Sequence, residues 1–359
     1  MQALNIHAGP RALAHLHSQG LRPADIHTIP AAAGGPKGLI LGPLDRFLFG
    51  QWLSQSDQPV HLVGASIGAW RMATACLDSS VTGFQRLEHD YIHQHYQTTP
   101  DQKKPTADQV SAEFGRNLEA FYRGQVAGIV RHPRFKLHIV TSRGRFLLRR
   151  EHPWRTPLGY TGAYLSNLGH RKALGRWLER VVFSAPQVQP PCDLSDFRSR
   201  VVPLSVQNFM PALQASCSIP FVLRAVHDIP GAPPGAYWDG GITDYHLHLN
   251  YAAHAQAGLV LYPHFQAQVV PGWLDKALKW RHRSTAFLDN MIVLSPKPAW
   301  VAQLPNAKLP DRQDFMHYGN DLTARVKVWT QAVQASQQLA DEWQAWLDSP
   351  DLAQVQPLR

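Results

Sequence analysis

The sequence predicts an α/β chain, because two short apolar strands each lead through a glycine-rich turn into a helix. The first unit joins a strand over 25–29 to a helix over 39–48, and the second joins a strand over 60–63 to a helix over 69–77. With 359 residues, 44% hydrophobic and 17% charged, the chain can bury a large core and is typical of a globular protein.

The second unit carries the motif G-x-S-x-G. It runs from Gly64 to Gly68 with Ser66 at its centre, between the strand and an Ala-rich helix. This context is that of a nucleophile elbow, where the serine occupies a strained turn and its glycine neighbours leave room for it. The turn also places the serine at a helix N-terminus, which favours negative charge. The alternative is a glycine-rich turn with an ordinary serine.

The loop of the first unit reads Gly34-Gly35-Pro36-Lys37-Gly38. A glycine-rich loop between a strand and a helix exposes backbone N–H groups that can bind an anion. It does not match a P-loop, because Lys37 is followed by glycine. Taken alone, such a segment is more often a tight turn than a binding site.

A third motif, Asp239-Gly240-Gly241, follows an aromatic pair and presents a carboxylate before two glycines. It predicts either a catalytic base or a simple Asp-Gly turn. A short helix over 211–219 and a strand over 221–226 precede it. The remaining predicted elements are helices over 10–19, 84–96, 107–130, 169–180, 273–291 and 321–347, a polar loop over 98–105, strands over 181–184 and 258–262, and a hairpin of 135–141 with 145–149.

The net charge of +9 is concentrated in one segment. Arg131 to Arg180 holds twelve Lys and Arg against Glu151 and Glu179, a net of +10, and the rest of the chain is about −1. This pattern predicts an anionic partner, namely a membrane surface, a phosphorylated substrate or a nucleic acid, unless the segment is merely a solvated face. We expect no nucleic acid, because no nucleic-acid motif accompanies the charge.

Other features indicate the compartment. No apolar stretch approaches the ~18 residues that span a bilayer, and residues 1–20 lack the apolar centre of a signal peptide. The three cysteines, Cys76, Cys192 and Cys217, are far apart and without metal-like spacing. We therefore expect a cytoplasmic protein with no metal and no cofactor.

Taken in order, the three motifs resemble the patatin-like phospholipase family, whose pattern is G-G-x-[R/K]-G, then G-x-S-x-G, then D-G-[G/A]. Residues 215–221, ASCSIPF, also look like the A-S-x-x-x-P segment that precedes the aspartate in that family. The resemblance covers about Ile26 to Leu249. The chain departs from the family at Ala33, where a third glycine is usual, and over 242–246, where many members have Asn and Pro. These departures leave the substrate class open.

The resemblance implies an α/β three-layer sandwich with a mainly parallel central sheet. We expect a catalytic domain over 1–265, and a helical C-terminal extension, 266–359, that packs on the same domain but is not covered by the resemblance. The activity implied is lipid acyl hydrolysis, as in a phospholipase, lysophospholipase or esterase, through an acyl-Ser66 intermediate. The site residues it implies are the nucleophile Ser66, the base Asp239, the elbow glycines Gly64 and Gly68, and an oxyanion hole from Gly34, Gly35, Pro36, Lys37 and Gly38.

Two other functions remain open. One is a Ser-His-Asp hydrolase with the same elbow and a late histidine as base; the other is a catalytically silent member of the family that binds an anionic surface or partner. The Asp-Gly-Gly motif favours the dyad over the triad. The histidines available to a triad are His246, His248, His254 and His264.

One segment bears on peripheral contact with an anionic membrane. Wound as a helix, 273–283 would place Trp273 and Trp280 on one face and Lys276, Lys279 and Arg283 on the other. Tryptophans beside cations are typical of interfacial helices. The alternative is a surface helix whose tryptophans pack into the core.

Overall fold

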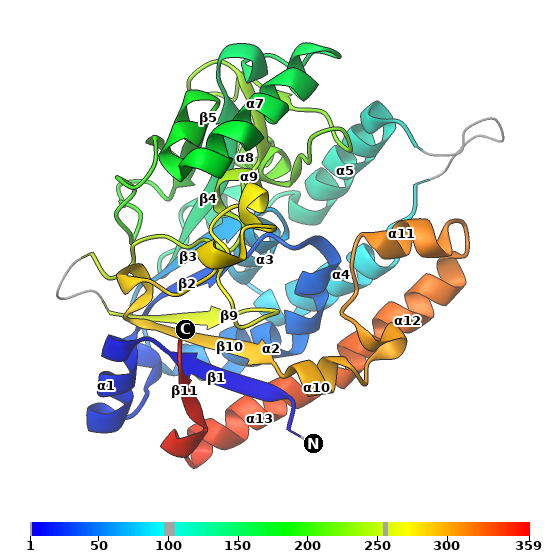
Figure 1. The fold of residues 1–359 in the computed structure, drawn as a ribbon. Helices are drawn as coiled ribbons and strands as arrows, with labels where there is room; N and C mark the ends of the chain where they lie inside the picture. The colour runs from blue at the N-terminus through cyan, green and yellow to red at the C-terminus, as the bar shows by residue number, and fades with distance from the viewer. Residues whose placement is uncertain (1, 97–104, 254–257) are drawn as a thin grey trace.

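The computed structural model describes residues 2–96, 105–253 and 258–359. Its described strands form one mixed, mainly parallel sheet in the order β11-β1-β10-β9-β2-β3-β4-β5-β6, with β8 beside β4 and β7 beside β8 (Figure 1). The strands are β1 (Leu4–Ala8), β2 (Ile26–Ala31), β3 (Val60–Ala65), β4 (Phe135–Gly144), β5 (Leu178–Ser184), β6 (Ser199–Pro203), β7 (Val226–His227), β8 (Ala236–Asp239), β9 (Leu259–Pro263), β10 (Met291–Pro296) and β11 (Val355–Pro357).

Helices pack against this sheet. Among them, α3 packs on β2, β3 and β4, α8 on β4 and β8, and α13 on β1. The α-helices are α1 (Pro10–Gln19), α2 (Gly42–Phe47), α3 (Ile67–Ala75), α4 (Ser80–Ile92), α5 (Ala107–Tyr122), α6 (Val126–Val130), α7 (Arg155–Gly169), α8 (Val206–Cys217), α9 (Gly241–Asp244), α10 (Pro298–Val301), α11 (Gln313–Tyr318), α12 (Leu322–Ala335) and α13 (Gln337–Asp348).

The central strands run parallel from β10 through β9, β2 and β3 to β4. Strands β5, β9 and β10 are buried along their whole length, which means that both faces of the sheet are covered there. The predicted α/β fold with a mainly parallel central sheet flanked by helices is confirmed. Antiparallel pairing is confined to β1 with β10, β4 with β5 and β8, and β7 with β8, among the strands described.

Strand β4 brings the ends of two other strands together. Its first part pairs in parallel with β3, so that Ala65 lies opposite Val140. Its last part pairs antiparallel with β8, so that Asp239 lies opposite Thr141, the next residue along. Strands β3 and β8 therefore approach each other from opposite directions on the same edge of β4. Whatever follows β3 must lie beside the end of β8.

The predicted hairpin of 135–141 with 145–149 is wrong. Strand β4 continues through Gly144 and pairs with β5, and Phe146–Leu148 forms a 3-10 turn. A Cβ on Gly144 would lie 1.9 Å from the carbonyl oxygen of Leu148, so the chain turns back tightly on itself there. The short spacing had indicated a hairpin, but the partner strand comes from residues further along the chain.

The predicted helix over 273–291 is also wrong. The segment forms 3-10 turns at Trp273–Asp275, Lys279–Arg281 and Ala286–Leu288, and then enters β10. The fully buried Asp275 explains this, because its carboxylate accepts hydrogen bonds from Asn167 and Arg281, each at 2.8 Å. A regular surface helix would direct the carboxylate of Asp275 toward solvent, whereas these short turns allow the carboxylate to be enclosed.

The segment 266–359 is not only helical, because it contributes β10 and β11 to the sheet on either side of β1. The helix predicted over 321–347 divides at Ser336 into α12 and α13.

The helix predicted over 84–96 begins earlier and ends at Ile92, and the loop predicted over 98–105 lies outside the described residues except for Pro105. No helix in the described part of the chain is both long and apolar enough to cross a bilayer.

Much of the basic excess between Arg131 and Arg180 is neutralised inside the protein. Arg180 is fully buried and pairs with Asp244 and Asp196, at 2.6 and 2.8 Å. Arg143 pairs with Glu179 at 2.6 Å. Two of these three carboxylates come from outside the basic segment, so the net charge of the segment overstates the charge on its surface. Arg150, which is exposed, pairs with Asp228 at 2.5 Å. The other exposed cations of the segment are Arg131, Arg149, Arg155, Lys172 and Arg176.

Candidate active site

Ser66 occupies a strained turn between β3 and α3. Its backbone has φ 57° and ψ −130°, a conformation that side chains other than glycine rarely adopt. Gly64 and Gly68 allow the turn, because a Cβ at Gly64 would lie 2.4 Å from the Cα of Ala69 and one at Gly68 would lie 1.9 Å from the carbonyl oxygen of Ala31. The sequence therefore folds here into a tight elbow that requires glycine at positions 64 and 68.

The hydroxyl of Ser66 donates a hydrogen bond of 2.7 Å to Oδ2 of Asp239. Each residue is 3% exposed. The pairing follows from the sheet, because Ser66 directly follows β3 and Asp239 ends β8. The other carboxylate oxygen of Asp239 accepts the backbone N–H of Gly241 at 2.7 Å, which fixes the orientation of the carboxylate. The two residues that the sequence singled out are thus in direct contact, 173 positions apart in the chain.

Burial raises the pKa of Asp239 above that of an ordinary carboxyl group. The positive charge of Arg312 opposes this most strongly, followed by the hydrogen bonds from Ser66 and Gly241 and by Lys276. Because a raised pKa makes the carboxylate a stronger base, this environment suits proton abstraction from the adjacent hydroxyl.

The segment 215–221, which resembles A-S-x-x-x-P, holds the backbone of Ser66 and of Asp239 through hydrogen bonds. The hydroxyl of Ser216, at the end of α8, accepts the backbone N–H of Ser66 at 2.9 Å and donates to the carbonyl of Val140 at 2.7 Å. The backbone carbonyl of Ser218 accepts the N–H of Asp239 at 2.9 Å. One short segment therefore holds the elbow and the carboxylate strand in register.

A buried ion pair anchors the chain just beyond Asp239. Helix α9 ends at Asp244, whose carboxylate oxygens accept from Nε and Nη2 of Arg180, at 2.7 and 2.6 Å. Such a bidentate pair fixes geometry as well as charge. This anchor lies in 242–246, where the sequence departs from the family pattern, and sequence reasoning did not identify it. The acid at position 244, within Ile-Thr-Asp-Tyr-His, was the available signal.

The glycine-rich loop lies at the same end of the sheet. It follows β2 and begins a 3-10 turn, Gly35–Leu41, with Gly35 at φ +57°. Ala33 donates its N–H to the carbonyl of Tyr245 at 3.0 Å. Within the described residues, the N–H groups of Gly34 and Gly35 donate to no protein acceptor. Of the remaining loop residues, Pro36 and Gly38 are buried and Lys37 is half-buried.

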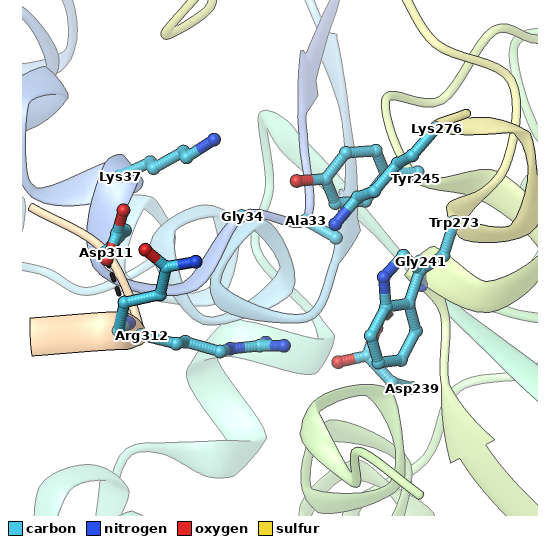
Figure 2. Close-up of a pocket in the computed structure, with 11 residues that line it drawn as sticks. Ala33, Gly34, Lys37, Asp239, Gly241, Tyr245, Trp273, Lys276, Asp311 and Arg312 are labelled. Atoms are coloured by element: carbon cyan, nitrogen blue, oxygen red, sulfur yellow. Dashed lines mark hydrogen bonds between the residues drawn. The ribbon is translucent and has the colours of Figure 1, made fainter. Parts of the chain in front are cut away.

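A cavity of about 190 Å³ opens beside Asp239 (Figure 2). Gly34 and Lys37 form one side of it. The C-terminal segment contributes five lining residues, among them Trp273, Lys276 and Arg312, and the side chain of Arg312 extends toward Asp239. Sequence reasoning missed the last two as site residues. Lys276 lay within a segment noticed for its tryptophans, and Arg312 had no local signal. The full lining is Ala33, Gly34, Lys37, Asp239, Gly241, Tyr245, Trp273, Lys276, Asp311, Arg312 and Gln313.

The histidines considered for a triad have other contacts. His246 interacts with the backbone of Gln268 and Val270, His248 with the hydroxyl of Thr285, and His264 with the backbone of Gln266. Burial lowers the pKa of all three rings, to about 4 for His248 and about 3 for His264. No histidine in the described part of the chain forms a hydrogen bond with Ser66 or Asp239, and His254 lies outside that part. Across the same described ranges, no group of three or more His, Cys, Asp or Glu could hold a metal ion.

No protein-family model and no curated protein matches this sequence. Among solved structures, the chain is similar to VipD from Legionella pneumophila, with a TM-score of 0.35 and 14% identity over 89% of this chain and 67% of that one. It is also similar to human GIVD cytosolic phospholipase A2, with a TM-score of 0.32 and 12% identity over 96% of this chain and 62% of that one. The chain thus spans about two thirds of the length of these two proteins.

Proposed function

We propose that this protein is a serine acyl hydrolase of the patatin-like type that cleaves carboxylic esters of lipids. The observation that carries the proposal is the 2.7 Å hydrogen bond between the buried side chains of Ser66 and Asp239, with the serine on a strained elbow. Nucleophilic catalysis needs a hydroxyl within reach of a base, and donors for the oxyanion. The raised pKa of Asp239 and the free N–H groups of the glycine-rich loop support this reading.

The proposed reaction begins when Oγ of Ser66 attacks the ester carbonyl carbon and its proton passes to Asp239. The tetrahedral oxyanion accepts hydrogen bonds from the backbone of Gly34 and Gly35. The bond to the alcohol then breaks, and Asp239 returns the proton to the departing oxygen, leaving an acyl-Ser66. A water molecule attacks this ester, Asp239 accepts its proton and then gives it to Oγ, and the free acid leaves.

The test compares Ser66→Ala and Asp239→Asn with the wild type on short-chain p-nitrophenyl esters. Each variant should lose at least about 10³-fold in kcat/KM, as expected when a group of a catalytic unit is removed. A fluorophosphonate probe should label the wild type at Ser66 alone. Matching far-ultraviolet circular dichroism of the variants and the wild type would exclude loss of fold as the cause.

Two results would contradict the proposal. Loss of activity on a single histidine substitution, for example at His246 or His254, with Asp239→Asn still active would favour the Ser-His-Asp alternative. A wild-type protein that neither hydrolyses esters nor reacts with the probe would favour a silent binding protein.

We also propose that the enzyme meets its lipid through an apolar surface on and around α7, rather than through a helix over 273–283. Trp154, Leu158 and Leu165 are 78%, 63% and 61% exposed along α7 and its start. Phe146 and Phe221, nearby, are 69% and 64% exposed. A cluster of large apolar side chains this exposed to solvent marks a surface that binds a partner protein or a membrane.

The charge around this surface and its position near the dyad favour an anionic membrane as the partner. Arg149 and Arg155 are exposed beside the apolar surface, and each Lys or Arg near an anionic leaflet contributes about 1 kcal/mol. The surface is also joined to the dyad, because Tyr160 of α7 packs against Phe221 and against Trp238, which precedes Asp239.

Co-sedimentation with anionic and neutral vesicles, at low and high salt, tests this surface. The variant Trp154→Ser/Leu158→Ser/Leu165→Ser should lose binding to anionic vesicles at least about tenfold. Met316→Ser, a change at a methionine that is also 69% exposed but on α11, is the matched control. Equal binding of the triple variant and the wild type would exclude this surface.

A further inference from the structure

Three cations line the cavity beside the dyad. Lys37 comes from the glycine-rich loop, and Lys276 and Arg312 come from the C-terminal segment. The carboxylates that line the same cavity are Asp239 and Asp311. Of these, Asp311 is already paired with Lys308 at 2.9 Å, and Asp239 accepts from Ser66 and Gly241. The cavity is therefore richer in positive charge than its own carboxylates can balance.

The cations themselves have few protein partners. Among the described residues, none of Lys37, Lys276 and Arg312 forms a salt bridge with a carboxylate. The two lysines contact aromatic rings instead. Lys276 Nζ lies 4.0 Å from the ring centroid of Tyr245, and Lys37 Nζ lies 5.5 Å from the ring centroid of Phe265. Such contacts orient a cation without neutralising it.

The cations also act on one another. Partial burial of its ammonium, followed by the charges of Arg312 and Lys37, lowers the pKa of Lys276 to about 8, while Asp239 opposes the shift. Burial lowers the pKa of Lys37 as well, and Lys308 and Arg312 contribute in the same direction while Asp311 opposes them. Mutual repulsion of this kind costs stability in the unliganded protein, and a bound anion would relieve it.

We propose that this cavity binds an oxyanion on the substrate, a phosphate or a carboxylate close to the scissile ester, with Arg312 and Lys276 as its principal ligands. The inference deepens the proposed function and rests on it. A guanidinium matches the geometry of phosphate and carboxylate through two parallel hydrogen bonds, and an ammonium adds a point charge. The size of the cavity suits a small charged group, and an acyl chain would extend elsewhere.

This assigns a role to the C-terminal segment. The dyad, the elbow and the glycine-rich loop all lie before residue 250, whereas Lys276 and Arg312 follow it. The chemistry and the recognition of charge are thus supplied by different parts of the chain. A simpler role for Arg312, holding Asp239 deprotonated, would affect charged and neutral esters equally, and this difference is what the experiment measures.

The kinetic experiment uses two matched pairs of esters. Lysophosphatidate and the monoacylglycerol with the same acyl chain differ by a phosphate on the alcohol side. The p-nitrophenyl esters of succinate and butyrate differ by a carboxylate on the acyl side. The wild type should prefer the anionic member of at least one pair by about tenfold or more in kcat/KM, and the pair that shows the preference identifies the source of the anion.

Arg312→Gln and Lys276→Met should each reduce that preference by about tenfold, mainly through KM, as loss of a hydrogen bond to a charged group predicts. Lys279→Met, an exposed lysine three residues from Lys276 and outside the cavity, is the control and should keep the preference. Absence of a preference in the wild type, or an equal loss on both members of a pair, would overturn the proposal.

A binding experiment separates this proposal from the proposed function. In the Ser66→Ala protein, calorimetric titration with glycerol phosphate and with succinate should give saturable binding to one of them. Arg312→Gln in that background should weaken the Kd at least about tenfold, and Lys279→Met should not. Binding that is absent, or that both changes weaken equally, contradicts the oxyanion site whether or not the wild type hydrolyses any ester.

Discussion

The dyad and the cations beside it are held in different ways. Ser66 and Asp239 lie at buried strand ends, held by backbone pairing and by the hydroxyl of Ser216. Lys276 follows a 3-10 turn and Arg312 directly precedes α11, and much of each side chain is open to solvent. Substitution around the dyad should therefore disturb folding and chemistry together. Substitution of the cations should change charge recognition and pH dependence while the fold persists.

The largest effect should come from Gly68→Ala, in the buried elbow beside the dyad. The new Cβ would lie 1.9 Å from a backbone oxygen of Ala31, which cannot move aside as a flexible side chain could. We expect destabilisation of about 3 kcal/mol or more, with loss of activity. Thermal unfolding measures it, with Gly128→Ala as control, because a Cβ at Gly128 meets no atom within 4 Å. Equal melting temperatures for the two variants would contradict the elbow geometry.

A smaller effect is expected from Ser216→Ala. The change removes the acceptor for the N–H of Ser66 and the donor to Val140, leaving buried polar groups unpaired at a cost of about 1–3 kcal/mol. It should also lower kcat, because the elbow loses its support.

Ser218→Ala is the matched control for this change. Its hydroxyl is equally buried but donates only to the carbonyl of Gln214, one turn earlier in the chain. Denaturant unfolding should give a loss of less than about 1 kcal/mol for this variant. If Ser218→Ala destabilises the protein as much as Ser216→Ala does, the support assigned to Ser216 is wrong.

Among the cations, Arg312→Gln should move the acid limb of the pH profile. The proposed mechanism needs Asp239 deprotonated, so kcat/KM should fall as the pH drops through the pKa of Asp239. Burial raises that pKa and Arg312 lowers it, so removal of the arginine should raise it further and shift the limb to higher pH. The pH dependence of kcat/KM on neutral p-nitrophenyl butyrate measures this shift. An acid limb at the same pH in the variant and the wild type would show that Arg312 acts only on the substrate.

The smallest effect concerns Lys276, whose pKa of about 8 reflects burial, Arg312 and Lys37. The lysine is charged below this pKa, so the preference for an anionic ester should decline as the pH rises through about 8. Asp239, Arg312, Lys37 and the ring of Tyr245 are the groups that face it. Lys276→Arg should keep the preference to higher pH, and an identical decline in this variant would assign the titration to another group.

The contrast between the dyad and the cations also explains what the sequence could predict. The elbow, the glycine-rich loop and the Asp-Gly-Gly turn are local patterns in which steric demands fix the residue types, and the structure brings all three to one end of the sheet. The hydrogen bond between Ser66 and Asp239 itself followed only from the resemblance, because it depends on how β3 and β8 meet beside β4. Arg312 could not be found, because one arginine in a polar turn carries no spacing signal.

The wrong predictions share a physical cause. The helix over 273–291 had the right amphipathic period, but buried Asp275 bonds to Asn167, more than a hundred positions away. The hairpin at 142–144 had turn-like residues, but β4 pairs with β5 instead. In both cases a long-range contact outweighed a local preference, as is common where a charge must be buried. The domain boundary near residue 265 stays a prediction.

The position of β1 has a consequence for synthesis of the chain. This strand, near the N-terminus, lies between β10 and β11, so both of its neighbours are made long after it. At 5–20 residues per second, about 15–60 s pass on the ribosome before Met291 and the rest of β10 emerge. Through that interval Leu4–Ala8 has two unpaired edges, which are sites for aggregation. Early binding of a chaperone to this short segment should therefore raise the yield of folded protein.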